Sequence, residues 1–180
     1  MSHRKNILAI MGSAAEHSAN LRLLELIAAR TRDDFNLTIY KGLKSLPHFD
    51  PDASGDRPPG EVVALREAIE GADGLIICTP EYVFSLPSGL KNAMEWCVAT
   101  TVFSGKPTGL ITASANGLKG HEELQLIMRT VMARFTEETT LLIQGVKGKI
   151  NEEGALKDHA TAESLDRFLR AFKALVGTAD

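Results

Sequence analysis

Residues 74–97 read GLIICTPEYVFSLPSGLKNAMEWC. The stretch opens with the apolar run Leu75–Cys78, which is typical of a strand buried on both faces. A loop from Thr79 to Phe84 follows, and Ser85 and Pro87 then predict a helix, because serine caps helix N-termini and proline fits the first turn. A strand that delivers a loop to a helix places that loop at the carboxyl edge of a sheet, where open α/β proteins bind ligands. The alternative is an ordinary connection whose two aromatic side chains pack against the body.

Outward from this stretch, short apolar runs alternate with segments of helical period. The sequence predicts strands at 7–11, 36–41, 75–78, 108–112 and 139–144, and helices after Ser18, at 61–70, from Ser85 to Cys97, at 121–133 and around the stripe Leu165, Phe168, Leu169, Phe172 and Leu175. This alternation indicates a parallel sheet with helices on both faces. We therefore expect an α/β fold, a flavodoxin-like three-layer sandwich whose five-stranded parallel sheet has the order 2-1-3-4-5, in a single domain over residues 1–180.

Composition excludes several classes of protein. The chain has 180 residues, 44% of them hydrophobic and 24% charged, with a net charge of −3 and a pI near 6.0. No basic field is present to collect nucleic acid or anionic lipid, and no apolar run is long enough to cross a membrane. Two cysteines, Cys78 and Cys97, are too few for a disulfide framework or a metal site, although a reactive thiol stays open. We expect no metal, no nucleic-acid partner, no membrane span and a cytoplasmic location.

The loop after the first strand, residues 12–20, carries small hydroxyl residues into a helix N-terminus. Free N–H groups and the helix dipole make such a terminus an anion site, to which Ser13, Ser18 and Asn20 can add donors. The loop matches neither the dinucleotide nor the Walker glycine pattern. Helix capping alone is the alternative explanation for Ser18.

The other two loops complete a set of binding groups. Tyr82 and Phe84 offer faces on which a planar heteroaromatic ligand can stack, while Glu81 suits a structural or subunit contact. Glycines between Ser114 and Gly120 let the backbone approach a ligand closely. A phosphate end, a ring slot and a closing wall together fit a flavin mononucleotide, FMN.

These motifs resemble the NAD(P)H-dependent FMN reductase family, which includes quinone, azo-dye and chromate reductases. The resemblance covers about residues 5–176 and is carried by Gly12-Ser13…Ser18-x-Asn20 and by Thr79-Pro80-Glu81-Tyr82…Ser85-x-Pro87…Leu90-Lys91-Asn92-Ala93…Trp96. Leu46-Pro47…Phe49-Asp50 and the loop 114–117 support it.

The resemblance implies a cofactor site and no catalytic side chain. The cofactor-binding residues implied are Ser13, Ser18, Ala19, Asn20 and Leu21 for the phosphate and ribityl chain, Pro80, Glu81, Tyr82, Val83 and Phe84 along the ring, and Ser114, Ala115, Asn116 and Gly117 on the far side. The chain departs from the family where Ala15 replaces an arginine and Val83 an asparagine. The first departure weakens the expected hold on the phosphate.

The implied activity is hydride transfer from NADPH or NADH to FMN and onward to a quinone, azo compound, metal oxyanion or free flavin. A flavodoxin-type electron carrier and a degenerate, flavin-free binding protein are the alternatives. Family members are dimers or tetramers, and Met94 and Trp96 lie off the Leu86/Leu90/Cys97 stripe of their helix. We therefore expect an exposed indole and a homo-oligomer.

Overall fold

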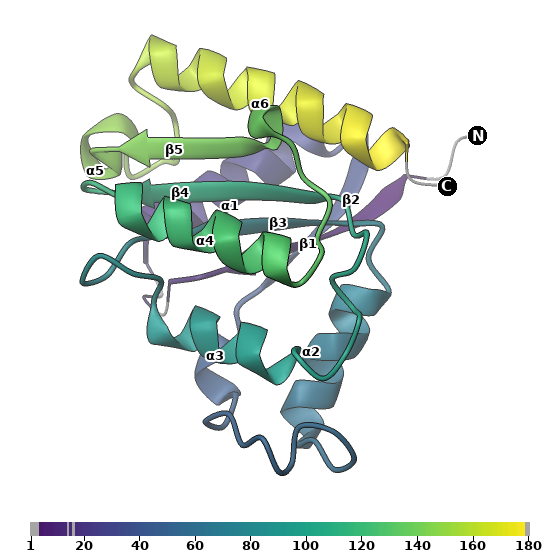
Figure 1. Ribbon diagram of the computed structural model, residues 1–180. Coiled ribbons are helices and arrows are strands. Elements are labelled where there is room, and N and C mark those ends of the chain that lie inside the picture. Colours follow the sequence, from purple (N-terminus) through teal and green to yellow (C-terminus); the bar gives the residue numbers. More distant parts are fainter. Residues whose placement is uncertain (1–3, 14, 16, 179–180) are drawn as a thin grey trace.

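The computed structural model describes residues 4–13, 15 and 17–178. Figure 1 shows strands and helices alternating along the chain. The strands are β1 (Lys5–Met11), β2 (Phe35–Tyr40), β3 (Gly74–Thr79), β4 (Thr108–Ser114) and β5 (Thr140–Gln144). The helices are α1 (Ala19–Thr31), α2 (Gly60–Glu70), α3 (Ser88–Trp96), α4 (Leu118–Thr130), α5 (Val146–Lys149) and α6 (His159–Gly177), with 3₁₀ turns η1 (Gly42–Ser45) and η2 (Glu137–Thr139).

The five strands form one parallel sheet in the order β2-β1-β3-β4-β5, which confirms the predicted fold class. In its centre Leu8 of β1 pairs with Leu75 of β3, and Leu75 with Thr108 of β4. Every residue of β3 is buried, as expected for a central strand covered on both faces. The chain order reverses between β1 and β3, so the crevice at their carboxyl ends is the topological switch point.

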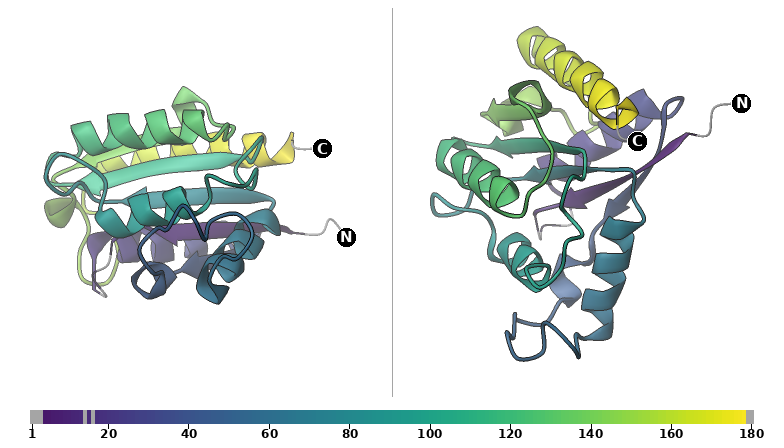
Figure 2. Two further views of the ribbon diagram at one scale, coloured as in Figure 1. Left: turned by 60° about the horizontal axis from the view of Figure 1, so that its bottom comes forward. Right: turned by 45° about the vertical axis from the view of Figure 1, so that its right-hand side comes forward.

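Helices cover both faces of the sheet (Figure 2). The sheet therefore separates two hydrophobic cores, one on each face. The even-numbered apolar positions of β1, such as Leu8 and Ile10, pack with α2, α3 and α4. The odd-numbered positions, such as Ile7 and Ala9, pack with α1 and α6. This alternation follows from the two-residue period of a strand.

Two details of the predicted helix after β3 are wrong. The helix begins at Ser88, its N-cap position is Pro87, and no side chain bonds its first amides, so Ser85 is not its cap. Ser85 instead ends a tight turn and bonds a carboxylate of α4. Leu86 and Cys97 are buried as expected, but they flank the helix.

The expected exposed indole is also wrong. Trp96 is 1% exposed and Met94 is buried, because the segment after η1 folds back over α3. The Trp96 ring packs edge to face on Phe49 at 5.4 Å, and its Nε1 donates to the carbonyl of Pro47 at 2.8 Å. An exposed indole at Trp96 therefore no longer supports the expected homo-oligomer.

The long connection 42–60 is held against the body along much of its length. Asn92 accepts from the amide of Phe49 at 2.8 Å and donates to the carbonyl of Pro47 at 2.9 Å. Arg66 of α2 binds carbonyls of Ser54 and Trp96. Two further differences lie beyond β4: α4 starts at Leu118, and the short α5 follows β5.

Candidate functional site

The loops after β1, β3 and β4 meet at the carboxyl edge of the sheet. Gly12 allows the first two to touch, since a Cβ atom placed there would lie 2.6 Å from the Cβ of Thr79 and 2.9 Å from a methyl group of Leu90. The amide of Gly12 donates to the carbonyl of Cys78 at 2.8 Å. Contacts this short require a residue without a side chain, so glycine is needed at position 12.

The start of α1 presents backbone donors. Ser18 is its N-cap, as predicted, and its Oγ accepts from the amide of Leu21 at 3.1 Å. Ala19 and Asn20 stand in the first turn, whose N–H groups have no partner within the helix. With the dipole, which places roughly half a positive charge at this end, these amides suit an anion.

The side chain of Asn20 points into the protein. Its Nδ2 donates to the carbonyl of Ala113 at 3.1 Å, and the thiol of Cys78 lies 3.2 Å from its Oδ1. The side chain thus ties α1 to β3 and β4, so it is not the free donor that the sequence led us to expect in this loop. Burial raises the pKa of Cys78 strongly and that of Cys97 to about 11, so both thiols are buried and protonated near neutral pH.

Ser13 links the first two loops. It is buried, its Oγ accepts from the amide of Ala15 at 3.2 Å, and the same atom lies 3.5 Å from the Tyr82 hydroxyl. Ala15 and His17 are exposed beside it. The structure therefore brings Ser13, Ser18 and Tyr82 to one edge, as the sequence predicted.

Residues Tyr82 to Ser85 form a tight hairpin turn. The amide of each end residue donates to the carbonyl of the other, at 2.9 and 3.0 Å. Val83 and Phe84 between them have φ values of 51° and 58°, in the left-handed region. A turn with two such residues normally takes Asn or Gly, and each departure costs on the order of 1–3 kcal/mol. The two side chains are 94% and 72% exposed, so packing within this chain does not offset the strain.

Glu81 joins the second loop to the third. Its two carboxylate oxygens accept from the amides of Gly117 at 3.2 Å and Gly120 at 2.8 Å, at the N-terminus of α4. Its own amide donates to Ser114 Oγ at 3.2 Å. Gly117 has a φ of 87°, and the space around it would not admit a Cβ atom without displacement of Leu142. The Glu81 carboxylate is thus held by helix amides, which is the structural role foreseen for it.

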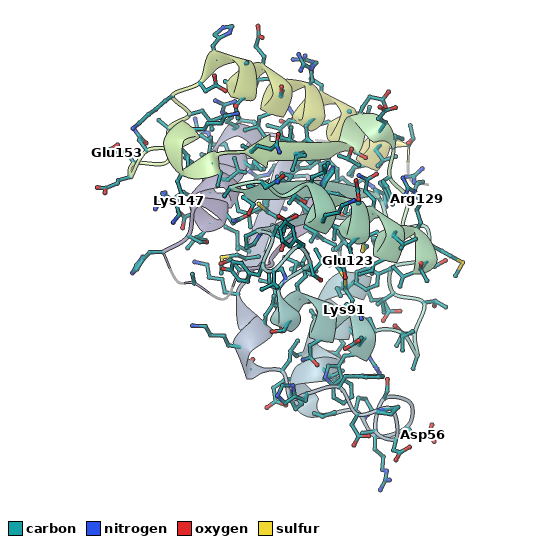
Figure 3. All side chains as sticks on the ribbon, turned by 60° about the vertical axis from the view of Figure 1, so that its left-hand side comes forward. Asp56, Lys91, Glu123, Arg129, Lys147 and Glu153 are labelled. Carbon is teal, nitrogen blue, oxygen red and sulfur yellow. The ribbon has the colours of Figure 1, made fainter. Side chains whose placement is uncertain are left out.

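Sequence reasoning missed Glu123. It stands in the middle of α4 (Figure 3). Its Oε2 accepts from Ser85 Oγ at 2.6 Å and from the amide of Leu86 at 3.0 Å. Periodicity marks position 123 only as a polar helix residue, since its partners lie on another loop. No local signal in the sequence could have found this contact.

His121 lies under the third loop. It is 8% exposed, and its Nδ1 is 2.9 Å from the hydroxyl of Thr112 at the end of β4. Desolvation lowers the pKa of its imidazole. The neutral ring therefore packs the start of α4 onto the sheet.

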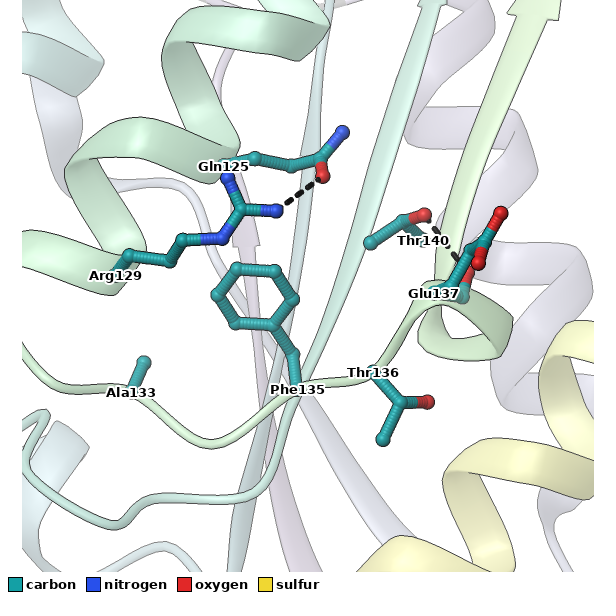
Figure 4. A pocket seen from close by; sticks show the side chains of 7 residues that line it. All are labelled: Gln125, Arg129, Ala133, Phe135, Thr136, Glu137 and Thr140. Carbon is teal, nitrogen blue, oxygen red and sulfur yellow. Dashed lines mark hydrogen bonds between the residues drawn. The ribbon is translucent and has the colours of Figure 1, made fainter.

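A separate pocket of about 430 Å³ lies beside the second half of α4 (Figure 4). Its wall includes Phe135 and Arg129, whose guanidinium stands over the Phe135 ring at 5.4 Å and donates to Gln125 at 3.1 Å. None of the predicted cofactor residues lines it. Within residues 4–13, 15 and 17–178 no cluster of three metal-ligating side chains occurs, and no helix is long and apolar enough to cross a membrane.

The sheet order defines a flavodoxin-like protein in which the loops after β1, β3 and β4 meet at the carboxyl edge. The model of the NADPH-dependent FMN reductases matches residues 5–147, and the chain belongs to this family of oxidoreductases. FMN as cofactor and NADH or NADPH as co-substrate fit that assignment.

Named relatives span nearly the whole chain. A subunit of the NADH:(hydroxy)cinnamate reductase of Vibrio ruber is 33% identical over 93% of this chain and 85% of its own length. A quinone reductase of Escherichia coli is 28% identical over 96% of this chain and 95% of its own. Among solved structures, the flavoenzyme NAD(P)H:(acceptor) oxidoreductase FerB of Paracoccus denitrificans superposes with a TM-score of 0.85 at 24% identity, covering 97% of this chain and 98% of that one.

Proposed function

We propose that the chain, as one domain, binds FMN at the carboxyl edge of its sheet and passes reducing equivalents from NADH or NADPH to a quinone. The observation that carries the proposal is the contact of Ser13, in the loop that leads to the helix N-terminus at Ala19 and Asn20, with Tyr82 of the aromatic turn. The quinone reductase among the relatives supports the class of acceptor.

The residues present fit the cofactor. Gly12 and Gly117 have no side chain that would fill the carboxyl edge of the sheet. The Ser13 hydroxyl connects the loop after β1, called the phosphate loop below, to the aromatic turn. When bound, FMN supplies a ring that takes a hydride from the nicotinamide and hands electrons to the acceptor.

The chain's own residues bind and orient. The first amides of α1 and the Ser13 hydroxyl hold the phosphate end, while Tyr82, Val83 and Phe84 wall the ring, mainly through main chain and stacking. The loop 114–117 closes the far side. No acid, base or nucleophile is needed for such a reaction, because holding the reactants in the right orientation accelerates it.

We further propose a homo-oligomer. Three large apolar side chains along α4 and just after it are exposed: Leu118, Leu126 and Met132. Apolar side chains gathered along one helix are typical of a subunit interface. A cytoplasmic location stays an expectation, to which the two free cysteines add support.

An absorbance experiment tests the function. The purified chain is loaded with FMN and mixed with NADPH or NADH without oxygen, and benzoquinone is then added. A reductase bleaches rapidly and regains its colour with quinone. A flavin that is reduced only slowly would indicate a carrier, and a chain that takes up no FMN would indicate the flavin-free alternative.

The placement of the ring is tested by Tyr82→Ala, with Tyr82→Phe as the control that keeps the aromatic face. Loss of stacking worth about 0.5–1.5 kcal/mol raises the FMN dissociation constant several-fold in the alanine variant only. Equal affinity of both variants and the unmodified chain would show that the ring lies elsewhere.

A further inference from the structure

We propose that Glu123 is a positioning residue, which holds the turn Tyr82–Ser85 in the shape that receives the flavin ring. The proposal rests on the proposed placement of FMN at this turn. Glu123 itself lies on α4 and binds Ser85 and Leu86, so it acts on a ligand only through the turn.

The turn needs such a hold because its sequence disfavours its shape. Val83 and Phe84 both occupy left-handed backbone, and neither side chain is packed. Valine is branched at Cβ and is among the residues least suited to this region. Left with only the paired backbone bonds of Tyr82 and Ser85, the turn would relax toward extended conformations.

Both ends of the turn are attached to one rigid element. On the near side, the Glu81 carboxylate binds amides at the start of α4. On the far side, the Glu123 carboxylate reaches back from α4 to the hydroxyl of Ser85 and the amide of Leu86. The two carboxylates therefore clamp the turn from opposite directions, and a hydrogen bond to a charged acceptor is stronger than a neutral one.

The clamp also sets where the turn meets the phosphate loop. The Tyr82 hydroxyl lies 3.5 Å from Ser13 Oγ, and Ser13 Oγ in turn accepts a hydrogen bond from the amide of Ala15. A turn that shifts moves the aromatic wall relative to the start of α1. A preformed wall saves the ligand the cost of ordering it, so loss of Glu123 weakens FMN binding without removing any group that touches FMN.

The experiment compares Glu123→Ala and Glu123→Gln with the matched control Glu122→Ala. Glu122 is the next residue on α4, is exposed and pairs with Lys119 rather than with the turn. Amide hydrogen exchange of apo protein is measured over residues 80–90. In Glu123→Ala the amides of Ser85 and Leu86 exchange at least about tenfold faster than in the unmodified chain. The increase is smaller in Glu123→Gln, and Glu122→Ala exchanges at the original rate. Unchanged exchange in Glu123→Ala overturns the proposal.

Flavin fluorescence titration of the same apo proteins supplies the second readout. Glu123→Ala raises the FMN dissociation constant about tenfold, and adding Val83→Asn recovers most of the loss, because asparagine tolerates left-handed backbone. In the presence of Glu123 the same substitution has a smaller effect, because the turn is already held. Equal effects of Val83→Asn in both backgrounds would point to a general loss of stability and overturn the proposal.

The two proposals fail in different ways. If Tyr82→Ala weakens FMN binding while Glu123→Ala does not, the ring placement stands and the positioning role is overturned. If neither variant changes FMN affinity, the ring placement itself is wrong, and the positioning role is overturned with it.

Discussion

Val83 is the residue whose backbone is most at odds with its side chain. It has a φ of 51° and is 94% exposed, so its replacement by asparagine removes strain and disturbs little packing. We expect Val83→Asn to raise the free energy of unfolding by about 1 kcal/mol, which corresponds to roughly 2–4 °C in Tm for a chain of this size. The matched control is Val98→Asn, at an exposed valine outside the left-handed region, which should leave Tm nearly unchanged. Equal shifts in both variants would show that Val83 carries no strain.

Ala15 decides the charge at the phosphate end. It is exposed next to the start of α1, whose dipole offers partial positive charge to the roughly two negative charges of the flavin phosphate that we propose to bind there. A charge-assisted bond is worth about 1.5–3 kcal/mol, so Ala15→Arg should tighten FMN at least several-fold at low salt, with a smaller gain as salt rises. Ala29→Arg adds the same charge at the other end of α1 and should have no such effect. Equal affinity of Ala15→Arg and the unmodified chain would mean that another cation already serves the phosphate.

The junction of β4 and α4 carries a pH dependence through His121. Its pKa is lowered by burial, so below pH about 6.5 the unfolded chain takes up a proton that the folded chain resists. Its contribution to stability is therefore complete above pH 6.5 and falls as the pH drops toward the folded pKa. Urea unfolding at pH 7.5 and 5.5 should show a smaller loss in His121→Gln than in the unmodified chain. An equal loss in His121→Gln and in the unmodified chain would contradict this role of His121.

Helix α3 is the element that holds the long connection 42–60. Asn92 satisfies both the amide of Phe49 and the carbonyl of Pro47, so Asn92→Ala leaves polar backbone groups without this partner. We expect a loss of about 1–3 kcal/mol in the free energy of unfolding, measured by urea titration. Lys91→Ala removes only a half-exposed ion pair with Glu95 and should cost a few tenths of a kcal/mol, about 0.3–0.5. Similar losses in the two variants would show that the connection is not pinned through Asn92.

The same helix shows where prediction from sequence stopped. Buried apolar runs such as Leu75–Cys78 predict strands. Their alternation with amphipathic helices is enough to predict the sheet order, because parallel crossovers allow few topologies. The helix period placed Trp96 outside, but the indole is covered by Pro47 and Phe49 from a loop far along the chain. The converging loops of the candidate site were foreseen from their own motifs. The Glu123 contact depends on how two loops and a helix meet in space, which no local pattern records.

At the scale of the whole molecule, the exposed apolar side chains of α4 are the basis for the proposed homo-oligomer. Leu118 and Leu126 lie eight residues apart and so on the same side of the helix, and Leu126 is 63% exposed. We expect sedimentation velocity at micromolar concentration to show a dimer or larger assembly, and Leu126→Asp to shift it toward the single subunit, because a charge buried in an apolar interface is unfavourable. Val98→Asp, at a valine of 65% exposure away from α4, is the matched control and should leave the assembly intact. A single-subunit mass for the unmodified chain with FMN present would contradict the assembly. Equal dissociation by both aspartates would instead move the interface away from this face of α4.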